Sequence, residues 1–136
     1  MDSNNNSSKK ADKPAVQWLN KPEDHDYPAA ASYLNLILDS DSVKKLTADL
    51  QDAKVVTFKS KDLLRAAQLP LLDEHNYHVA HDLSKINQNK SLSPLLLVRD
   101  TKLRRLIIAD GYHRLCAVYL YDEDTLIPCQ IVSLNG

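Results

Sequence analysis

The stretch Leu106-Ile107-Ile108-Ala109-Asp110-Gly111-Tyr112-His113-Arg114 decides the fold of this chain. Its first four residues are apolar and partly β-branched, which is typical of a buried strand, and the apolar residues from position 112 to 121 have helical spacing. Gly111 lies between the two patterns and is one of only two glycines in the chain. The sequence therefore predicts a strand, a glycine turn and a helix in direct succession.

A helix that begins at a glycine turn after a strand is a candidate anion site. It presents free backbone N–H groups and the positive end of the helix dipole. His113 and Arg114 fall in the first helical turn, where acidic side chains are usual, and their charges favour phosphate. In a simpler interpretation, Asp110 caps the helix. The two basic side chains then pair with Asp122 or Glu123, and spacing alone leaves both interpretations open.

Periodicity outward from this stretch indicates an α/β (α+β) fold class. It predicts strands at residues 55–58, 94–98 and 127–134 and helices at residues 61–68 and 73–89. Because only the polar stretch 100–105 separates the strands at 94–98 and 106–109, these two strands are predicted to form a hairpin. Ser60 is expected to cap the helix at 61–68. A strand that feeds a helix, as here, is an α/β signature.

The chain before residue 54 divides into two parts of different composition. Residues 1–14 have almost nothing to bury, which predicts a disordered tail. Residues 15–53 predict a helical extension, in which one helix begins at Asp26 and ends near position 39. Asp41 or Ser42 is expected to cap a second helix. That helix carries an apolar stripe of Val43, Leu46 and Leu50, and residues 54–136 form the main domain.

The composition excludes several classes of protein. At 136 residues, 43% hydrophobic and 26% charged, the chain resembles one folded domain rather than a membrane-embedded or disordered protein. Its net charge of −1 argues against a nucleic-acid partner. The chain has no run of about 18 apolar residues, and its N-terminus is polar. We therefore expect no membrane association and a cytoplasmic location. Cys116 and Cys129 are predicted to be buried thiols.

Three segments, residues 94–98, 106–117 and 127–132, together resemble the ParB/sulfiredoxin-like superfamily. The most specific of them contains the string Asp-Gly-x-His-Arg-x-x-Ala at positions 110–117. The resemblance covers residues 55–134 and is greatest to small stand-alone bacterial members of unassigned function. It implies a ParB/sulfiredoxin-like fold for residues 54–136, a small mixed sheet with packed helices.

The resemblance implies a pocket for nucleotide phosphates. Sulfiredoxins bind ATP with a Gly-Cys-His-Arg turn that also carries their reactive cysteine, ParB partition proteins bind CTP with a Gly-Glu-Arg-Arg version, and other relatives are nucleases or small-molecule kinases. Carried over, Gly111, His113 and Arg114 contact the phosphates of ATP or CTP with Mg²⁺, while Asp110 positions the turn. Tyr112 occupies the position of the sulfiredoxin cysteine. Sulfinic acid reduction is therefore not expected, nor is DNA clamping, because the chain lacks the helix-turn-helix that follows the ParB domain.

The helix at 73–89 supplies further candidates. Its three histidines recur every third residue, and at about 100° per residue no more than two of them can face one ion, so no metal site is predicted. The resemblance places His78 beside the phosphate pocket and makes Asp73 or Glu74 a candidate base or Mg²⁺ ligand, with His113 as a proton donor. The simpler interpretation of Asp73 and Glu74 is a solvated loop and a helix cap.

These observations lead to one leading functional hypothesis and two alternatives. The leading hypothesis is a nucleotide- or phosphate-binding domain with phosphoryl transfer or NTP hydrolysis as its candidate reaction, and with Asp110, Gly111, Tyr112, His113 and Arg114 forming the phosphate site. One alternative is a non-catalytic module whose pocket is degenerate and whose helices at 28–52 bind a protein partner, which an exposed apolar stripe on those helices would favour. The other is a metal-dependent nuclease, which requires acidic residues gathered around Asp110.

Overall fold

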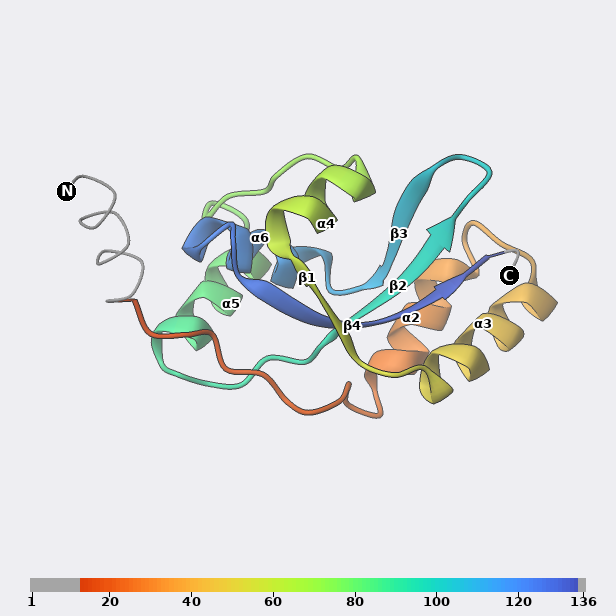
Figure 1. Cartoon of the computed structure of the whole chain (residues 1–136), viewed down its shortest axis with the longest axis horizontal. Coiled ribbons are helices and arrows are strands. Elements are labelled where there is room, and N and C mark those ends of the chain that lie inside the picture. Colours follow the sequence, from red (N-terminus) through yellow and green to blue (C-terminus); the bar gives the residue numbers. More distant parts are fainter. Residues whose placement is uncertain (1–12, 135–136) are drawn as a thin grey trace.

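The computed structural model describes residues 13–134, so the predicted tail at 1–14 lies outside the described residues except for Lys13 and Pro14. The described part contains five helices and four strands. The helices are α2 (Asp26–Leu34), α3 (Ser40–Asp52), α4 (Ser60–Ala67), α5 (Tyr77–Asn87) and α6 (Tyr112–Tyr121), and the strands are β1 (Val56–Lys59), β2 (Leu95–Asp100), β3 (Arg105–Asp110) and β4 (Leu126–Ser133) (Figure 1). The predicted mixture of helices and strands is confirmed.

The strands form one mixed sheet in the order β1-β4-β2-β3. β1 is antiparallel to β4, β4 is parallel to β2, and β2 is antiparallel to β3. The predicted hairpin of β2 and β3 is confirmed, with Val98 opposite Ile107 and a register shift between Leu96 and Leu97. β3 and helix α6 together form the crossover connection between the parallel strands β2 and β4.

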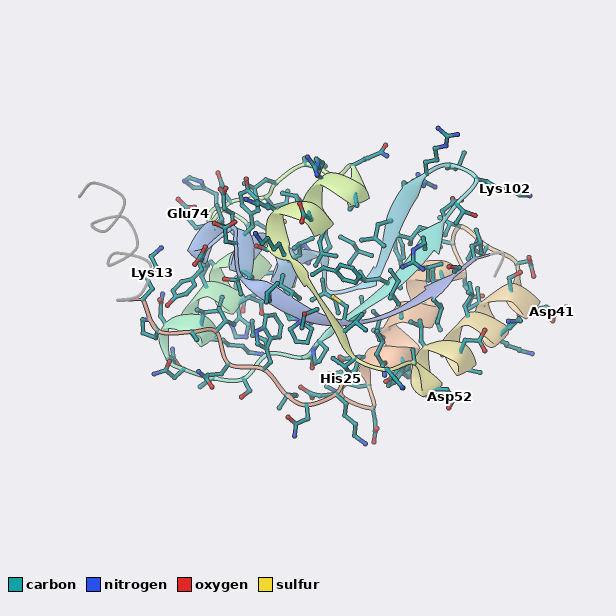
Figure 2. All side chains as sticks on the ribbon, viewed as in Figure 1. Lys13, His25, Asp41, Asp52, Glu74 and Lys102 are labelled. Carbon is teal, nitrogen blue, oxygen red and sulfur yellow. The ribbon has the colours of Figure 1, made fainter. Side chains whose placement is uncertain are left out.

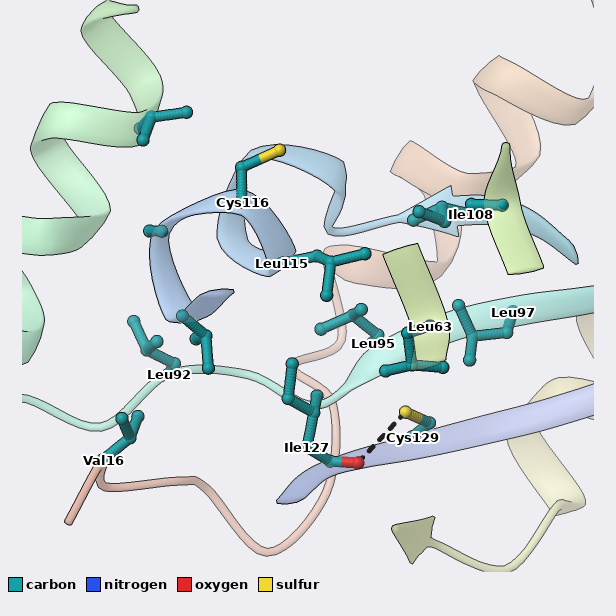
Figure 3. Close-up of a cluster of buried hydrophobic side chains, with 14 of the residues drawn as sticks. Val16, Leu63, Leu92, Leu95, Leu97, Ile108, Leu115, Cys116, Ile127 and Cys129 are labelled. Atoms are coloured by element: carbon teal, nitrogen blue, oxygen red, sulfur yellow. Dashed lines mark hydrogen bonds between the residues drawn. The ribbon is translucent and has the colours of Figure 1, made fainter. Parts of the chain in front are cut away.

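The central strand β2 is buried on both faces along its first four residues, which explains why these residues are an unbroken apolar run. Leu95 and Leu97 belong to a cluster with residues of α4, α5 and α6, which Figure 3 shows in close-up. Leu96 and Val98 belong to a second cluster with residues of α2 and α3 on the opposite face. Successive side chains of a strand point to opposite faces of the sheet. Leu95 and Leu97 therefore pack against one layer of helices, and Leu96 and Val98 pack against the other.

Helices α2 and α3 form one of these layers. The predicted stripe of Val43, Leu46 and Leu50 is buried in the second cluster. Tyr27 of α2 donates a hydrogen bond to Oε1 of Gln130 on β4 at 2.6 Å, which ties the helix to the sheet. A module that binds a partner through this stripe would leave it exposed, and in this structure the sheet covers it.

Three predictions about the ends and caps of helices are wrong. Helix α2 ends at Leu34 rather than near position 39. Asp39, not Asp41 or Ser42, caps α3, and its Oδ1 accepts from the backbone N–H of Ser42 at 2.8 Å. Ser60 makes no cap for α4, since its hydroxyl donates to the carbonyl of Glu123 at 2.6 Å and joins α4 to the turn before β4.

The two cysteines are buried free thiols, as predicted. Burial raises the pKa of Cys129 to about 12, and its thiol donates to the carbonyl of Ile127 at 3.2 Å (Figure 3). Burial also raises the pKa of Cys116. Of the helices between residues 13 and 134, none has the length and apolar character needed to cross a membrane.

Candidate functional site

Gly111 joins β3 to α6 in a conformation that other residues rarely adopt. Its φ is +112° and its ψ is +17°. A Cβ at this position would lie 2.8 Å from Cγ of Leu95 and 2.9 Å from Nη2 of Arg114. The turn therefore requires glycine for its backbone angle and for the space that the two neighbouring side chains occupy.

The N-terminus of α6 begins at this glycine without a side-chain cap from any described residue. Asp110 makes no capping hydrogen bond, so the expectation that it caps the helix is wrong. The first N–H groups of a helix have no partner inside the helix and carry its positive partial charge. The turn thus presents an uncapped helix N-terminus, the arrangement that proteins use for phosphate and carboxylate groups.

The Arg114 guanidinium lies under the same turn, and only 16% of its side chain is exposed. Its Nη2 is 3.2 Å from Oδ2 of Asp110 and 3.3 Å from the carbonyl of Pro94, so it pairs with neither Asp122 nor Glu123. Burial raises the pKa of Asp110 above its usual 3.8 although the charge of Arg114 opposes the shift. Nε of Arg114 is buried without a hydrogen-bond partner among the described residues, and such unsatisfied buried donors are rare in folded proteins.

His113 faces His78 of α5 across the start of α6. Their ring centroids are 4.8 Å apart, with the planes tilted by 44°. Burial lowers the pKa of His113 below its usual 6.5, the positive charge of His78 lowers it further, and Asp82 opposes both effects. At neutral pH the His113 imidazole is therefore uncharged, with one nitrogen as a donor and the other as an acceptor.

These groups line one small pocket of about 160 Å³ between α5 and the turn from β3 to α6. Its lining residues are His78, His81, Asp82, Asp110, Gly111, Tyr112, His113 and Arg114. The pocket brings together all five residues that the sequence marks for phosphate, together with His78. His81 and Asp82 also line the pocket, although the sequence alone did not assign them to it. They follow His78 by three and four residues, a spacing that places all three on the same face of a helix.

Asp73 and Glu74 are not among the residues that line this pocket. Both are exposed in the connection from α4 to α5, where Figure 2 labels Glu74. Oδ1 of Asp73 accepts from the backbone N–H of His75 at 2.9 Å, and this hydrogen bond lowers the pKa of Asp73. Helix α5 begins at Tyr77, not at position 73, because the side chain of Asn76 caps it. The carboxylate that α5 brings into the pocket is that of Asp82.

Tyr112 uses its hydroxyl outside the pocket. The hydroxyl donates to the carbonyl of Pro70 at 2.5 Å, which ties the start of α6 to the α4–α5 connection. Burial raises the pKa of the Tyr112 phenol. Tyr112 is thus an un-ionised phenol whose hydroxyl makes a structural hydrogen bond.

No group of three or more His, Cys, Asp or Glu side chains within residues 13–134 is arranged to hold a metal ion. The chain matches no family model, no curated protein and no solved structure in the comparisons made. The chemistry of the site is therefore inferred from its own residues.

Proposed function

We propose that the pocket at the start of α6 binds the phosphate end of a nucleotide or of another phosphorylated ligand. The observation that carries the proposal is the uncapped helix N-terminus at Gly111, with His113 and Arg114 lining the same pocket. Backbone N–H groups, a neutral imidazole N–H and a guanidinium are donors suited to phosphate oxygens. The resemblance to ParB/sulfiredoxin-like domains supports the same assignment, because it places a phosphate contact at each of these three residues.

The charge of the pocket favours a ligand that arrives with Mg²⁺. Asp82 and Asp110 line the pocket together with one arginine, so a bare phosphate dianion meets more negative than positive charge when the histidines are neutral. Magnesium is typically held by one or two carboxylates, phosphate oxygens and water rather than by an all-protein cage. Two carboxylates beside a phosphate site fit a magnesium–nucleotide complex, and Asp110 and Asp82 are the residues that would hold the ion.

The size of the pocket limits what it recognises. Sites that enclose a drug-sized ligand occupy roughly 300–1,000 Å³, and this one has about 160 Å³. That volume suits a phosphate group rather than a whole nucleotide. The ribose and base then lie outside the pocket, so ATP and CTP are both candidates and the residues around Gly111 do not select between them.

The arrangement also assigns roles for phosphoryl transfer or NTP hydrolysis. Arg114 and the helix N–H groups would stabilise the charge that develops on the transferred phosphoryl group. His113, whose pKa is lowered, would move a proton at an imidazole nitrogen. Asp82 takes the place in this scheme that the resemblance gives to Asp73 or Glu74, because Asp82 is the carboxylate of α5 that lines the pocket. The buried free thiols agree with the cytoplasmic location that we propose.

Calorimetric titration of MgATP and MgCTP into the wild-type protein and Arg114→Ala tests the proposal. Loss of a charged hydrogen-bond donor should weaken binding about tenfold or more. Arg65→Ala is the matched control, because the Arg65 side chain is 86% exposed on α4 and lies outside the pocket. Arg114→Lys keeps the charge without the forked donors and should bind with intermediate affinity. If a folded Arg114→Ala protein binds as tightly as the wild type, the proposal is wrong.

A further inference from the structure

A second and larger hollow lies between α4 and the far end of the β2–β3 hairpin, away from Gly111. Its volume is about 490 Å³. The lining residues are Phe58, Asp62, Leu63, Ala66, Arg99, Asp100, Thr101, Arg104, Arg105, Leu106 and Ile131. We call this hollow the hairpin groove. It shares no residue with the phosphate pocket, and its volume falls within the range of roughly 300–1,000 Å³ that is usual for small-molecule sites.

The floor of the hairpin groove is formed by residues of the sheet beside α4. Leu106 of β3 lies opposite Arg99 of β2. Ile131 of β4 lies opposite Leu97, which is two residues before Arg99 on β2. Leu63 of α4 forms one wall and Phe58 of β1, which is 36% exposed, closes the side. The groove is therefore apolar at its base, as a ligand site for an organic molecule requires.

The two carboxylates of the groove already have basic or N–H partners. Asp100 is buried, accepts from the backbone N–H of Leu103 at 3.1 Å, and has Nε of Arg105 at 3.8 Å from its Oδ2. Asp62 lies 3.6 Å from the guanidinium of Arg65 on the next turn of α4. Their negative charges are thus largely offset by these neighbours.

Arg99 and Arg104 are the cations of the groove that no carboxylate of the described residues neutralises. Nη1 of Arg99 donates to the hydroxyl of Ser133 at 3.1 Å, a neutral partner, and both arginines are exposed. The Arg104 side chain makes no hydrogen bond or ion pair with any residue between 13 and 134. Two guanidinium groups at the rim of an apolar floor are complementary to an anion that carries an apolar body.

The backbone at this rim is held in an unusual conformation. Arg104 has a φ of +52° and Gln68, at the end of α4, has a φ of +57°. The amide Nε2 of Gln68 donates to the carbonyl of Arg104 at 3.2 Å, which fixes the hairpin turn against α4. A left-handed residue other than glycine costs about 1–2 kcal/mol, and such strain concentrates at ligand sites. The end of α4 and the hairpin turn, the two elements that border the groove, are thereby tied together.

We propose that the hairpin groove is a second ligand site, and that its ligand is a small organic anion: a carboxylate with an aliphatic or aromatic body. The carboxylate contacts Arg99 and Arg104, and the apolar body lies on Leu106 and Ile131 against Leu63. The proposal is independent of the phosphate site, because the two hollows have separate residues at opposite ends of β3.

A matched pair of fluorescent probes tests this site. 8-Anilinonaphthalene-1-sulfonate has an anionic group on an apolar ring system, and N-phenyl-1-naphthylamine is the same ring system without the charge. We expect saturable binding of the sulfonate, competition by octanoate, and a loss of affinity of about tenfold or more in Arg99→Ala/Arg104→Ala. The neutral probe should bind the double variant and the wild type with affinities within about twofold.

Control variants distinguish binding in the groove from binding elsewhere on the protein. Lys102→Ala removes a positive charge at the tip of the same hairpin, where Figure 2 labels Lys102, but outside the groove lining, and should leave the sulfonate affinity unchanged. Arg114→Ala should also leave it unchanged, whatever happens to nucleotide binding. Methyl NMR shifts of Leu106 and Ile131 on addition of octanoate should locate the ligand. Equal sulfonate affinity in the double variant and the wild type, or methyl shifts confined to other parts of the chain, would overturn the proposal.

Discussion

Replacing Gly111 with alanine tests the physical reasoning about the turn from β3 to α6. The φ of +112° lies outside the range that an L side chain adopts readily, at a cost of about 1–2 kcal/mol. The added Cβ also lies 2.8 Å from Cγ of Leu95, which is fully buried, and overpacking of this kind costs about 1–3 kcal/mol. We therefore expect Gly111→Ala to lower the free energy of unfolding by about 2–5 kcal/mol.

Urea unfolding followed by circular dichroism measures this loss. Leu95→Ala is the matched companion, because it removes the side chain that the new Cβ meets, and by itself it should cost about 2–5 kcal/mol. In the double variant the cavity at position 95 admits the Cβ at position 111. The double variant should then lose less than the two single losses added together, by about 1–3 kcal/mol. A Gly111→Ala protein within about 0.5 kcal/mol of the wild type would refute the reasoning.

Three further perturbations test the electrostatics and the caps. Because burial raises the folded pKa of Asp110 above 3.8, its stabilising contribution is fully present below pH 3.8 and is lost as pH rises through the folded pKa. In the wild type the free energy of unfolding should fall as pH rises through the folded pKa of Asp110. In Asp110→Asn this fall should be smaller, as measured by urea unfolding at a series of pH values. His78→Gln removes the positive charge that opposes protonation of His113, so the pKa of His113 should move up toward 6.5, and an unchanged pKa in an imidazole NMR titration would contradict the pairing. Asp39→Ala removes the cap of α3 and should cost about 1 kcal/mol of unfolding free energy, whereas the same substitution at Asp41 should cost less.

The fold around the site was predictable because its signals are local. The apolar run before Gly111 and the helical spacing after it belong to one short stretch, and the structure has β3 and α6 there. The capping residues were harder to predict. Asp39 and Asn76 each lie within a few residues of another side chain able to cap the same helix, and the backbone path that chooses between them is set by packing rather than by the local sequence.

The residues of the candidate site around Gly111 were predictable from the sequence, but those that α5 contributes were not all predictable. The residues that surround Gly111 are consecutive in sequence, but Asp82 reaches the pocket because α5 packs beside α6, and no local pattern gives that distance. The hairpin groove was beyond prediction for the same reason. Arg99, Leu106 and Ile131 come from three strands, and only the register of the sheet brings them to the lining of one hollow.

The proposed role of residues 110–114 is to hold the phosphate end of a magnesium-bound nucleotide. The most direct test is a backbone amide NMR titration of the wild-type protein with ATP, CTP and GTP, each with and without Mg²⁺. We predict saturable shifts at residues 110–114 and 78–82, stronger with Mg²⁺, and little change at the hairpin turn around Lys102. The absence of shifts at millimolar nucleotide, or shifts that spare residues 110–114, would contradict this role.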